Sequence, residues 1–203
     1  MSKKGIIHTM AVEDAVNTIS TADYGLHCLV VYPNLDTLRE FYSRYIQKQI
    51  EERNEFIQMA PFYETEDSVR RVLSEGRISL DVERLEGKEK ALAIVDSLKK
   101  YFAADGEYTR FDLEVDKRMV DNAKTVGKSG YSGLGDIGAF HYEGRTHGLV
   151  EYELSLPPHY DDADIKRVCL YHQQDFNRLA AEQKKSLAEH HGLAIRIVPH
   201  KQK

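Results

Sequence analysis

The segment NAKTVGKSGYSGLGDIGAF, residues 122–140, contains Gly127, Lys128 and Ser129, the residue types with which phosphate-binding loops hold nucleotides. Such a loop needs a glycine five residues before its Gly-Lys, because the chain turns tightly while its amides point at phosphate. That position holds Asn122. The loop also follows a strand and opens a helix, whereas apolar residues at helical spacing over 115–126 predict a helix that ends here. We therefore expect Gly127 to terminate a helix, and no ATP site.

Asp136 lies in LGDIGAF, an apolar and glycine-rich stretch that predicts a buried position. A buried carboxylate is costly unless it is paired or functional. Two interpretations stay open: Asp136 acts in a binding site, or it pairs with Arg145 or caps a turn.

Several histidines and glutamates could bind a metal, and their spacing decides against it. His147 and Glu151 are four residues apart and would share a helix face, but the spacings to His141 and His159 match no zinc pattern. We expect no metal site and no cofactor. His190 and His191 are predicted at a helix C-terminus, where partly protonated histidine interacts favourably with the helix dipole.

Glu153 is the remaining candidate acid. If the helix around LVEYEL packs through Leu149, Tyr152 and Leu156, Glu153 lies nearest the buried side. No Ser-His-Asp order, Cys-His pairing or Gly-x-Ser-x-Gly motif is evident, which favours a protein that is not an enzyme. The alternative is an enzyme that uses Asp136 with His141 or Glu153 as acid and base.

These residues must be positioned by short apolar segments that have strand length and composition, at 27–32, 55–60, 77–82, 134–140, 167–172 and 193–198. Amphipathic helices are expected between most of them, including one over 88–101 and a last one that ends at Gly192. Such alternation predicts an α/β fold with three layers, a mostly parallel sheet covered by helices on both faces.

The composition places the chain among ordinary globular proteins. Its 203 residues carry a net charge of −5 and no basic block, which argues against direct nucleic-acid binding. No apolar run is long enough to span a membrane, and we expect a cytoplasmic location. Cys28 and Cys169 both lie in apolar runs, where free buried thiols are expected and neither a disulfide nor a metal pair is.

No linker divides the chain, so we expect a single domain over residues 24–203, preceded by an N-terminal arm over 1–23. The arm has a weak helical pattern between Met10 and Ile19. The sequence leaves open whether it is a docking arm or a loose terminus.

Three segments together resemble the MEDS sensory-domain family: HCLVVYPN at the first strand, GLGDIGAF with the following LVEYELSL, and VCLYHQQDFNRLAAEQKKSLAEHHGLAI near the end. The segment DGEYTRFDLEVDKRMV is also similar to the family's stretch before the Gly-Asp strand. The resemblance covers residues 24–198.

The resemblance implies a RecA/KaiC-like core that has lost its phosphate loop and serves in signal transduction or transcription regulation. After the first strand the chain has YPNLDT, with no glycine or lysine to hold a phosphate. In RecA-like enzymes an acid at the position of Asp136 would hold magnesium, a role without purpose here. The helix over 88–101 is longer than the family leads us to expect. We expect no attached output domain, so the signal would have to pass to a separate partner.

The expected function is therefore a sensory domain that binds a small molecule, of unknown identity, at the carboxyl ends of the strands. The expected ligand-binding residues are Tyr32, Pro33, Phe62, Asp136, His141, Glu153 and Tyr171. Signalling would pass through a protein partner or a homodimer, for which the arm or the helix over 88–101 would supply apolar surface.

Overall fold

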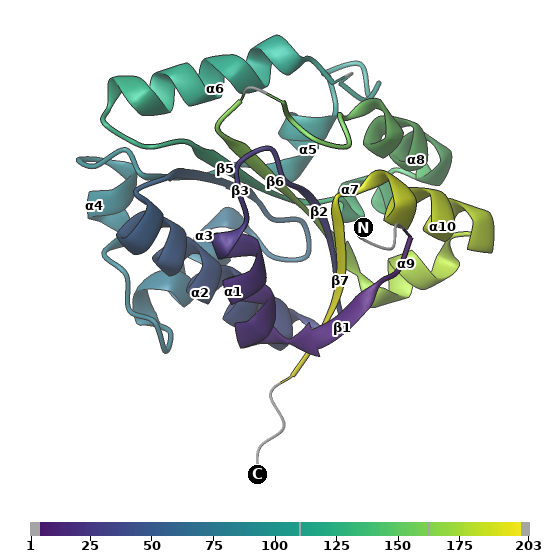
Figure 1. Cartoon of the computed structure of the whole chain (residues 1–203), viewed down its shortest axis with the longest axis horizontal. Coiled ribbons are helices and arrows are strands. Elements are labelled where there is room, and N and C mark those ends of the chain that lie inside the picture. The colour runs from purple at the N-terminus through teal and green to yellow at the C-terminus, as the bar shows by residue number, and fades with distance from the viewer. Residues whose placement is uncertain (1–4, 110, 162, 200–203) are drawn as a thin grey trace.

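The computed structural model describes residues 5–109, 111–161 and 163–199, whose strands form one sheet in the order β1-β7-β2-β6-β5-β3-β4 (Figure 1). The strands are β1 (His8–Ala11), β2 (His27–Tyr32), β3 (Phe56–Ala60), β4 (Leu92–Ile94), β5 (Tyr131–Asp136), β6 (Ile165–His172) and β7 (Leu193–Val198). All neighbouring strands pair in parallel. The helices are α1 (Val12–Thr21), α2 (Leu35–Arg53), α3 (Glu66–Glu75), α4 (Val82–Glu86), α5 (Ser97–Tyr101), α6 (Leu113–Thr125), α7 (Gly138–Tyr142), α8 (Thr146–Ser155), α9 (Gln173–Arg178) and α10 (Ala181–His190).

The helices divide into two layers. Helices α1 to α4 cover one face of the sheet, and α5 to α10 cover the other (Figure 1). Because both faces are covered, β2 and β5 are buried along their whole length, as expected for a parallel sheet. The predicted three-layer α/β fold is confirmed.

Residues 8–21 of the predicted N-terminal arm belong to this sheet and its covering layer. Strand β1 pairs with β7 at the sheet edge, and α1 buries Val12, Ala15, Val16 and Ile19. The apolar pattern that suggested a docking surface is therefore covered by the chain itself.

The strand predicted at 134–140 ends at Asp136 and is followed by α7, and three other predicted elements were wrong. Residues 77–82 form no strand: they lead into α4, whose N-cap Asp81 accepts from the amide of Arg84. Residues 88–101 are not one helix but a loop, then β4 and α5, because Leu92 and Ile94 pair as a strand with β3. The last helix is two, α9 and α10, since Leu179 and Ala180 between them have extended backbone.

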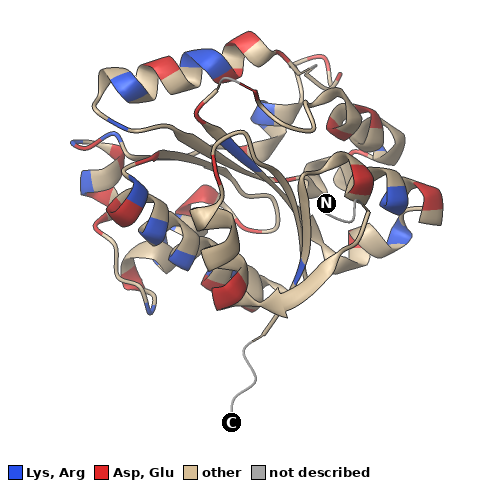
Figure 2. Cartoon of the chain, in the orientation of Figure 1, with Lys and Arg blue, Asp and Glu red and all other residues tan. Residues whose placement is uncertain are grey.

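Charged residues of both signs are spread over the helices and loops, and the strands are mostly uncharged (Figure 2). The exceptions include Lys166 and Arg167 in β6, which point to opposite faces and are both buried. Among the described helices, none combines the length and the apolar character that crossing a bilayer requires.

Candidate functional site

At the carboxyl ends of the central strands the structure brings two of the predicted residues together. The hydroxyl of Tyr32, at the end of β2, donates to Oδ2 of Asp136 at 2.7 Å. Oδ1 of Asp136 accepts from the amide of Gly138 at 2.9 Å, so the carboxylate also caps the turn into α7. Burial raises the pKa of Asp136 to about 7, against the two hydrogen bonds, which lower it.

The other aromatic residues at this edge surround the same turn. Phe62 is half-buried over Gly138, where an added Cβ would lie 2.6 Å from its ring. Its neighbour Tyr63 donates to the carboxylate of Asp175, and Pro33 directly follows Tyr32 in the link to α2. Both acids here thus already have donors from the chain.

The remaining predicted residues lie apart from Asp136. The buried Tyr171 packs edge-on against Phe176, with ring centres 5.6 Å apart. His141, in α7, has Thr146 as its neighbour at 3.4 Å. Glu153, in α8, contacts His27 and His191, which lie at the amino ends of β2 and β7. Asp136, His141 and Glu153 each have separate partners, so the acid–base pairing considered from the sequence is not formed. Arg145 pairs with Glu107 and not with Asp136.

Neither possible phosphate loop has the required geometry. Helix α6 ends before Gly127, which has a φ of +78°, and β5 follows. Lys128 then donates to Oδ1 of Asn54 at 3.3 Å. After β2, the side chain of Asn34 accepts from the amide of Thr37 and caps α2 directly, which leaves no glycine-rich turn.

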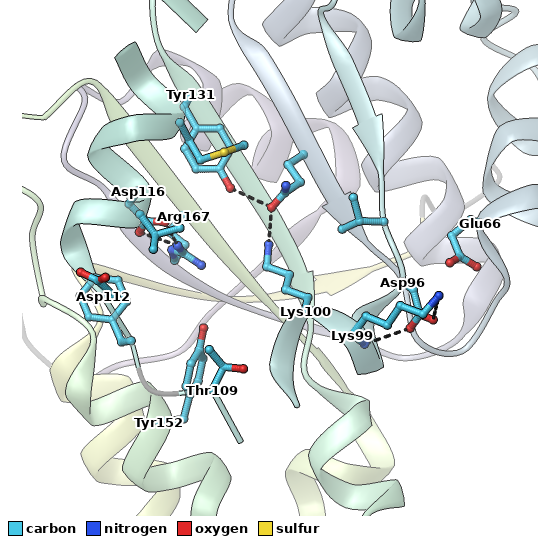
Figure 3. A pocket seen from close by; sticks show the side chains of 15 residues that line it. Glu66, Asp96, Lys99, Lys100, Thr109, Asp112, Asp116, Tyr131, Tyr152 and Arg167 are labelled. Carbon is cyan, nitrogen blue, oxygen red and sulfur yellow. Dashed lines mark hydrogen bonds and ion pairs between the residues drawn. The ribbon is translucent and has the colours of Figure 1, made fainter. Parts of the chain in front are cut away.

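A cavity of about 730 Å³ lies elsewhere, over the faces of β3, β5 and β6 and under α6 (Figure 3). Its walls come from α5, α6, α8 and the segment before α6. It is lined by Gln58, Glu66, Val95, Asp96, Lys99, Lys100, Thr109, Phe111, Asp112, Val115, Asp116, Met119, Tyr131, Tyr152 and Arg167. None of the residues expected from the sequence belongs to this lining.

The floor of the cavity depends on a glycine in β5. Gln58 of β3 pairs in register with Gly133, which pairs in turn with Arg167 of β6. Side chains at paired positions of a sheet point to the same face, so Gly133 leaves a space between two polar side chains. A Cβ at Gly133 would lie 2.8 Å from the hydroxyl of Tyr131.

The two cations of the cavity's inner wall have different partners. Arg167 forms a buried ion pair with Asp116. Lys100 donates instead to the neutral amide oxygen of Gln58 at 2.8 Å, an oxygen that also accepts from Tyr131 at 3.2 Å (Figure 3). Burial, and then repulsion from Arg167, lower the pKa of Lys100 to about 7. Lys100 forms no ion pair with any carboxylate in the described part of the chain.

Sequence reasoning missed this cavity because its polar groups come from segments far apart in the chain. From the sequence, Lys100 is an ordinary cation in the last turn of a predicted helix. The alternating glycines of SGLG were the available signal, since glycine inside a strand marks a position that another group approaches closely.

Comparison with solved structures places the architecture in a known class. A KaiC-like protein from the hyperthermophilic archaeon Pyrococcus horikoshii is similar to this chain, with a TM-score of 0.53 and 15% sequence identity. The match covers 95% of this chain and 80% of that one, and at this identity it shows the fold alone. The family model of the MEthanogen/methylotroph, DcmR Sensory domain (MEDS) matches residues 26–191, and the chain belongs to this family. No curated protein matches the sequence.

Proposed function

We propose that this sensory domain binds a small organic molecule in the cavity under α6 and reports its presence to a protein partner. The volume of about 730 Å³ is the observation that carries the proposal, since ligand pockets generally measure about 300–1,000 Å³. Membership of a sensory-domain family supports the same function. The cavity replaces the strand ends as the proposed site because Tyr32 and Asp136 are fully buried and already hydrogen-bonded to each other.

The lining favours a carboxylate with an apolar body. Phe111, Met119 and Tyr152 provide apolar wall, and Lys100 provides a cation whose partner is a neutral amide. A bound carboxylate would supply the missing counter-charge, and charge-assisted hydrogen bonds are about twice as strong as neutral ones. Arg167 is neutralised by Asp116, so Lys100 is the proposed anchor.

Helix α6 is the proposed route of the signal. Val115 and Asp116 line the cavity from this helix, so a ligand that contacts them would favour one position of α6 over another. The outer face of α6, which carries the exposed Glu114, Lys117 and Arg118, is accessible to a partner.

Calorimetric titration tests the ligand class. The probes are acetate, butyrate, hexanoate and benzoate, with benzamide as the neutral analogue of benzoate. We expect the larger carboxylates to bind and benzamide to bind at least tenfold more weakly. Lys100→Met should weaken benzoate binding by about tenfold to a hundredfold, as removal of a charged hydrogen bond does. Lys117→Met is the matched control, because the Lys117 side chain lies outside the cavity lining and pairs with Glu114 on the surface of α6.

The pH dependence of binding gives a second test. Because the pKa of Lys100 is about 7, its ammonium is lost as the pH rises from about 6 to about 9, and benzoate affinity should fall over that range. Benzoate binding that is unchanged in Lys100→Met, or no binding by any of the four acids, would contradict the proposed ligand class.

A further inference from the structure

Four buried side chains that could bind a metal ion meet between the sheet and the helices α8 and α10. They are His27 at the start of β2, Glu153 in α8, Cys169 in β6 and His191 after α10. Each can offer one ligand atom, and these atoms all lie within 4.8 Å of one another. None of the four residues is more than 5% exposed.

The hydrogen bonds of the two histidines show which ring nitrogen faces the cluster. Nδ1 of His27 lies 3.0 Å from the carbonyl oxygen of Pro157, and Nδ1 of His191 lies 2.7 Å from that of Leu187. A carbonyl oxygen only accepts, so each Nδ1 carries the proton. In the neutral imidazole, Nε2 then has a lone pair, and in both residues Nε2 is directed at the cluster.

The groups opposite these lone pairs are a carboxylate and a thiol. Oε2 of Glu153 lies 3.1 Å from Nε2 of His191 and 3.7 Å from Nε2 of His27. Sγ of Cys169 lies 3.4 Å from the same atom of His27. Oε1 of Glu153 is buried and has no hydrogen-bond partner among the described residues. A proton on Nε2 of His191 would satisfy its contact with Glu153, and the thiol of Cys169 can donate a weak hydrogen bond to His27, but a cation at the centre would bind all four groups at once.

We propose that His27, Glu153, Cys169 and His191 bind a divalent transition-metal ion, with zinc the best match to this donor set. Zinc takes nitrogen, sulfur and carboxylate ligands in tetrahedral geometry, with bonds of about 2.0–2.3 Å. Those bonds place two ligand atoms roughly 3.3–3.6 Å apart, close to the separations of 3.1, 3.4 and 3.7 Å found here.

Charge and outer contacts support the same conclusion. A thiolate and a carboxylate together balance the two positive charges of zinc, so the buried complex is neutral overall. The carbonyl groups of Pro157 and Leu187 orient the two imidazoles, as second-shell acceptors do around bound zinc. Four protein ligands complete the coordination, which makes the site structural and leaves no open position for catalysis.

The site is independent of the proposed ligand cavity, whose lining shares none of these residues. A second cavity of about 370 Å³, lined in part by Pro158, His190 and His191, borders the site at His191. The sequence predicted no metal site because the spacings to His141 and His159 match no zinc pattern. The four residues proposed here come from four separate segments, which no local spacing connects.

The metal content of the full-length protein, purified without chelators, tests the proposal. Mass spectrometry of the elements should find about one zinc per chain. Cys169→Ser and His191→Asn should lose at least nine-tenths of it. The matched controls Cys28→Ser and His190→Asn should keep it, since Cys28 is a buried free thiol on the other face of the sheet and His190 bonds to Leu156.

Cobalt provides a measurement on the unmutated chain, should the Cys169 and His191 variants fail to fold. Cobalt bound at this site should give an intense near-ultraviolet band from thiolate-to-metal charge transfer, and Cys28→Ser should retain that band. The proposal is overturned if the wild-type chain binds neither zinc nor cobalt, if the cobalt spectrum lacks the thiolate band, or if Cys169→Ser retains a full equivalent of metal.

Discussion

Replacement of Gly135 by alanine should destabilise the protein through a single steric contact. A Cβ at this position of β5 would lie 2.0 Å from the hydroxyl oxygen of Tyr101, where ordinary contacts begin near 3.4 Å. Tyr101 cannot simply move away, because it is 3% exposed and its ring packs against two others. The ring centres of Phe140 and Tyr152 lie 5.4 and 5.6 Å from that of Tyr101. The chain must therefore shift by more than about 1 Å within a close-packed region.

The expected cost follows from the size of this overlap. Overpacking of a core typically costs about 1–3 kcal/mol, and alanine recovers only about 0.4–1 kcal/mol by restricting the unfolded chain. We expect Gly135→Ala to lower the free energy of unfolding by about 2 kcal/mol, and the melting temperature by roughly 4–8 °C. Tyr101→Phe removes the clashing oxygen and leaves Cζ, 3.3 Å from the new Cβ, as the nearest atom. Gly135→Ala should therefore cost at most half as much unfolding free energy in the Tyr101→Phe background as it does in the wild-type chain.

Urea unfolding followed by circular dichroism measures all four members of this double-mutant cycle. Gly148→Ala is the control, because a Cβ at Gly148 would lie 3.4 Å from the ring of Tyr108, which is an ordinary contact. Gly148 lies in α8, where alanine favours the helix. That variant should be neutral or more stable. A loss below about 0.5 kcal/mol for Gly135→Ala, or equal losses with and without the Tyr101 hydroxyl, would refute the steric argument.

Two further predictions concern buried charges. Burial raises the folded-state pKa of Asp136 from 3.8 to about 7, so its stabilising contribution is present at low pH and is lost as the pH rises through about 7. Asp136→Asn should accordingly gain stability relative to wild type as the pH rises from about 4 to about 7, by up to about 1.4 kcal/mol per pH unit, and the difference should be constant above that range; a difference in unfolding free energy that does not change between about pH 4 and about pH 7 would contradict this. Glu55→Gln should cost about 3–5 kcal/mol, because it leaves the buried Lys166, 3.2 Å away, without its counter-charge. Unfolding by guanidinium should show that adding Lys166→Met to Glu55→Gln recovers part of this loss, and a further loss would count against the ion pair.

Much of the architecture could be predicted from the sequence because it depends on local patterns. The strands at 27–32 and 193–198 appear as mostly apolar runs, and parallel pairing follows from the helices between them. Such patterns fail where tertiary contacts override local preference. Residues 88–101 have helical spacing, yet Leu92 and Ile94 complete the sheet edge beside β3. Tertiary context of this kind outweighs weak intrinsic propensity.

The sequence by itself also determined that no phosphate loop is present, since that motif requires glycines at fixed local positions and Asn122 and Asn34 occupy the critical places. The two candidate sites were decided only by the tertiary structure. Lys100 meets Gln58 from 42 positions away, and Cys169 meets His27 from 142 positions away. Which side chains share a face depends on strand register and helix packing, and a shift of one residue in register would reverse every side chain of a strand. Chemistry assembled across the sheet therefore has no signature in local spacing, whereas a backbone loop that binds phosphate does.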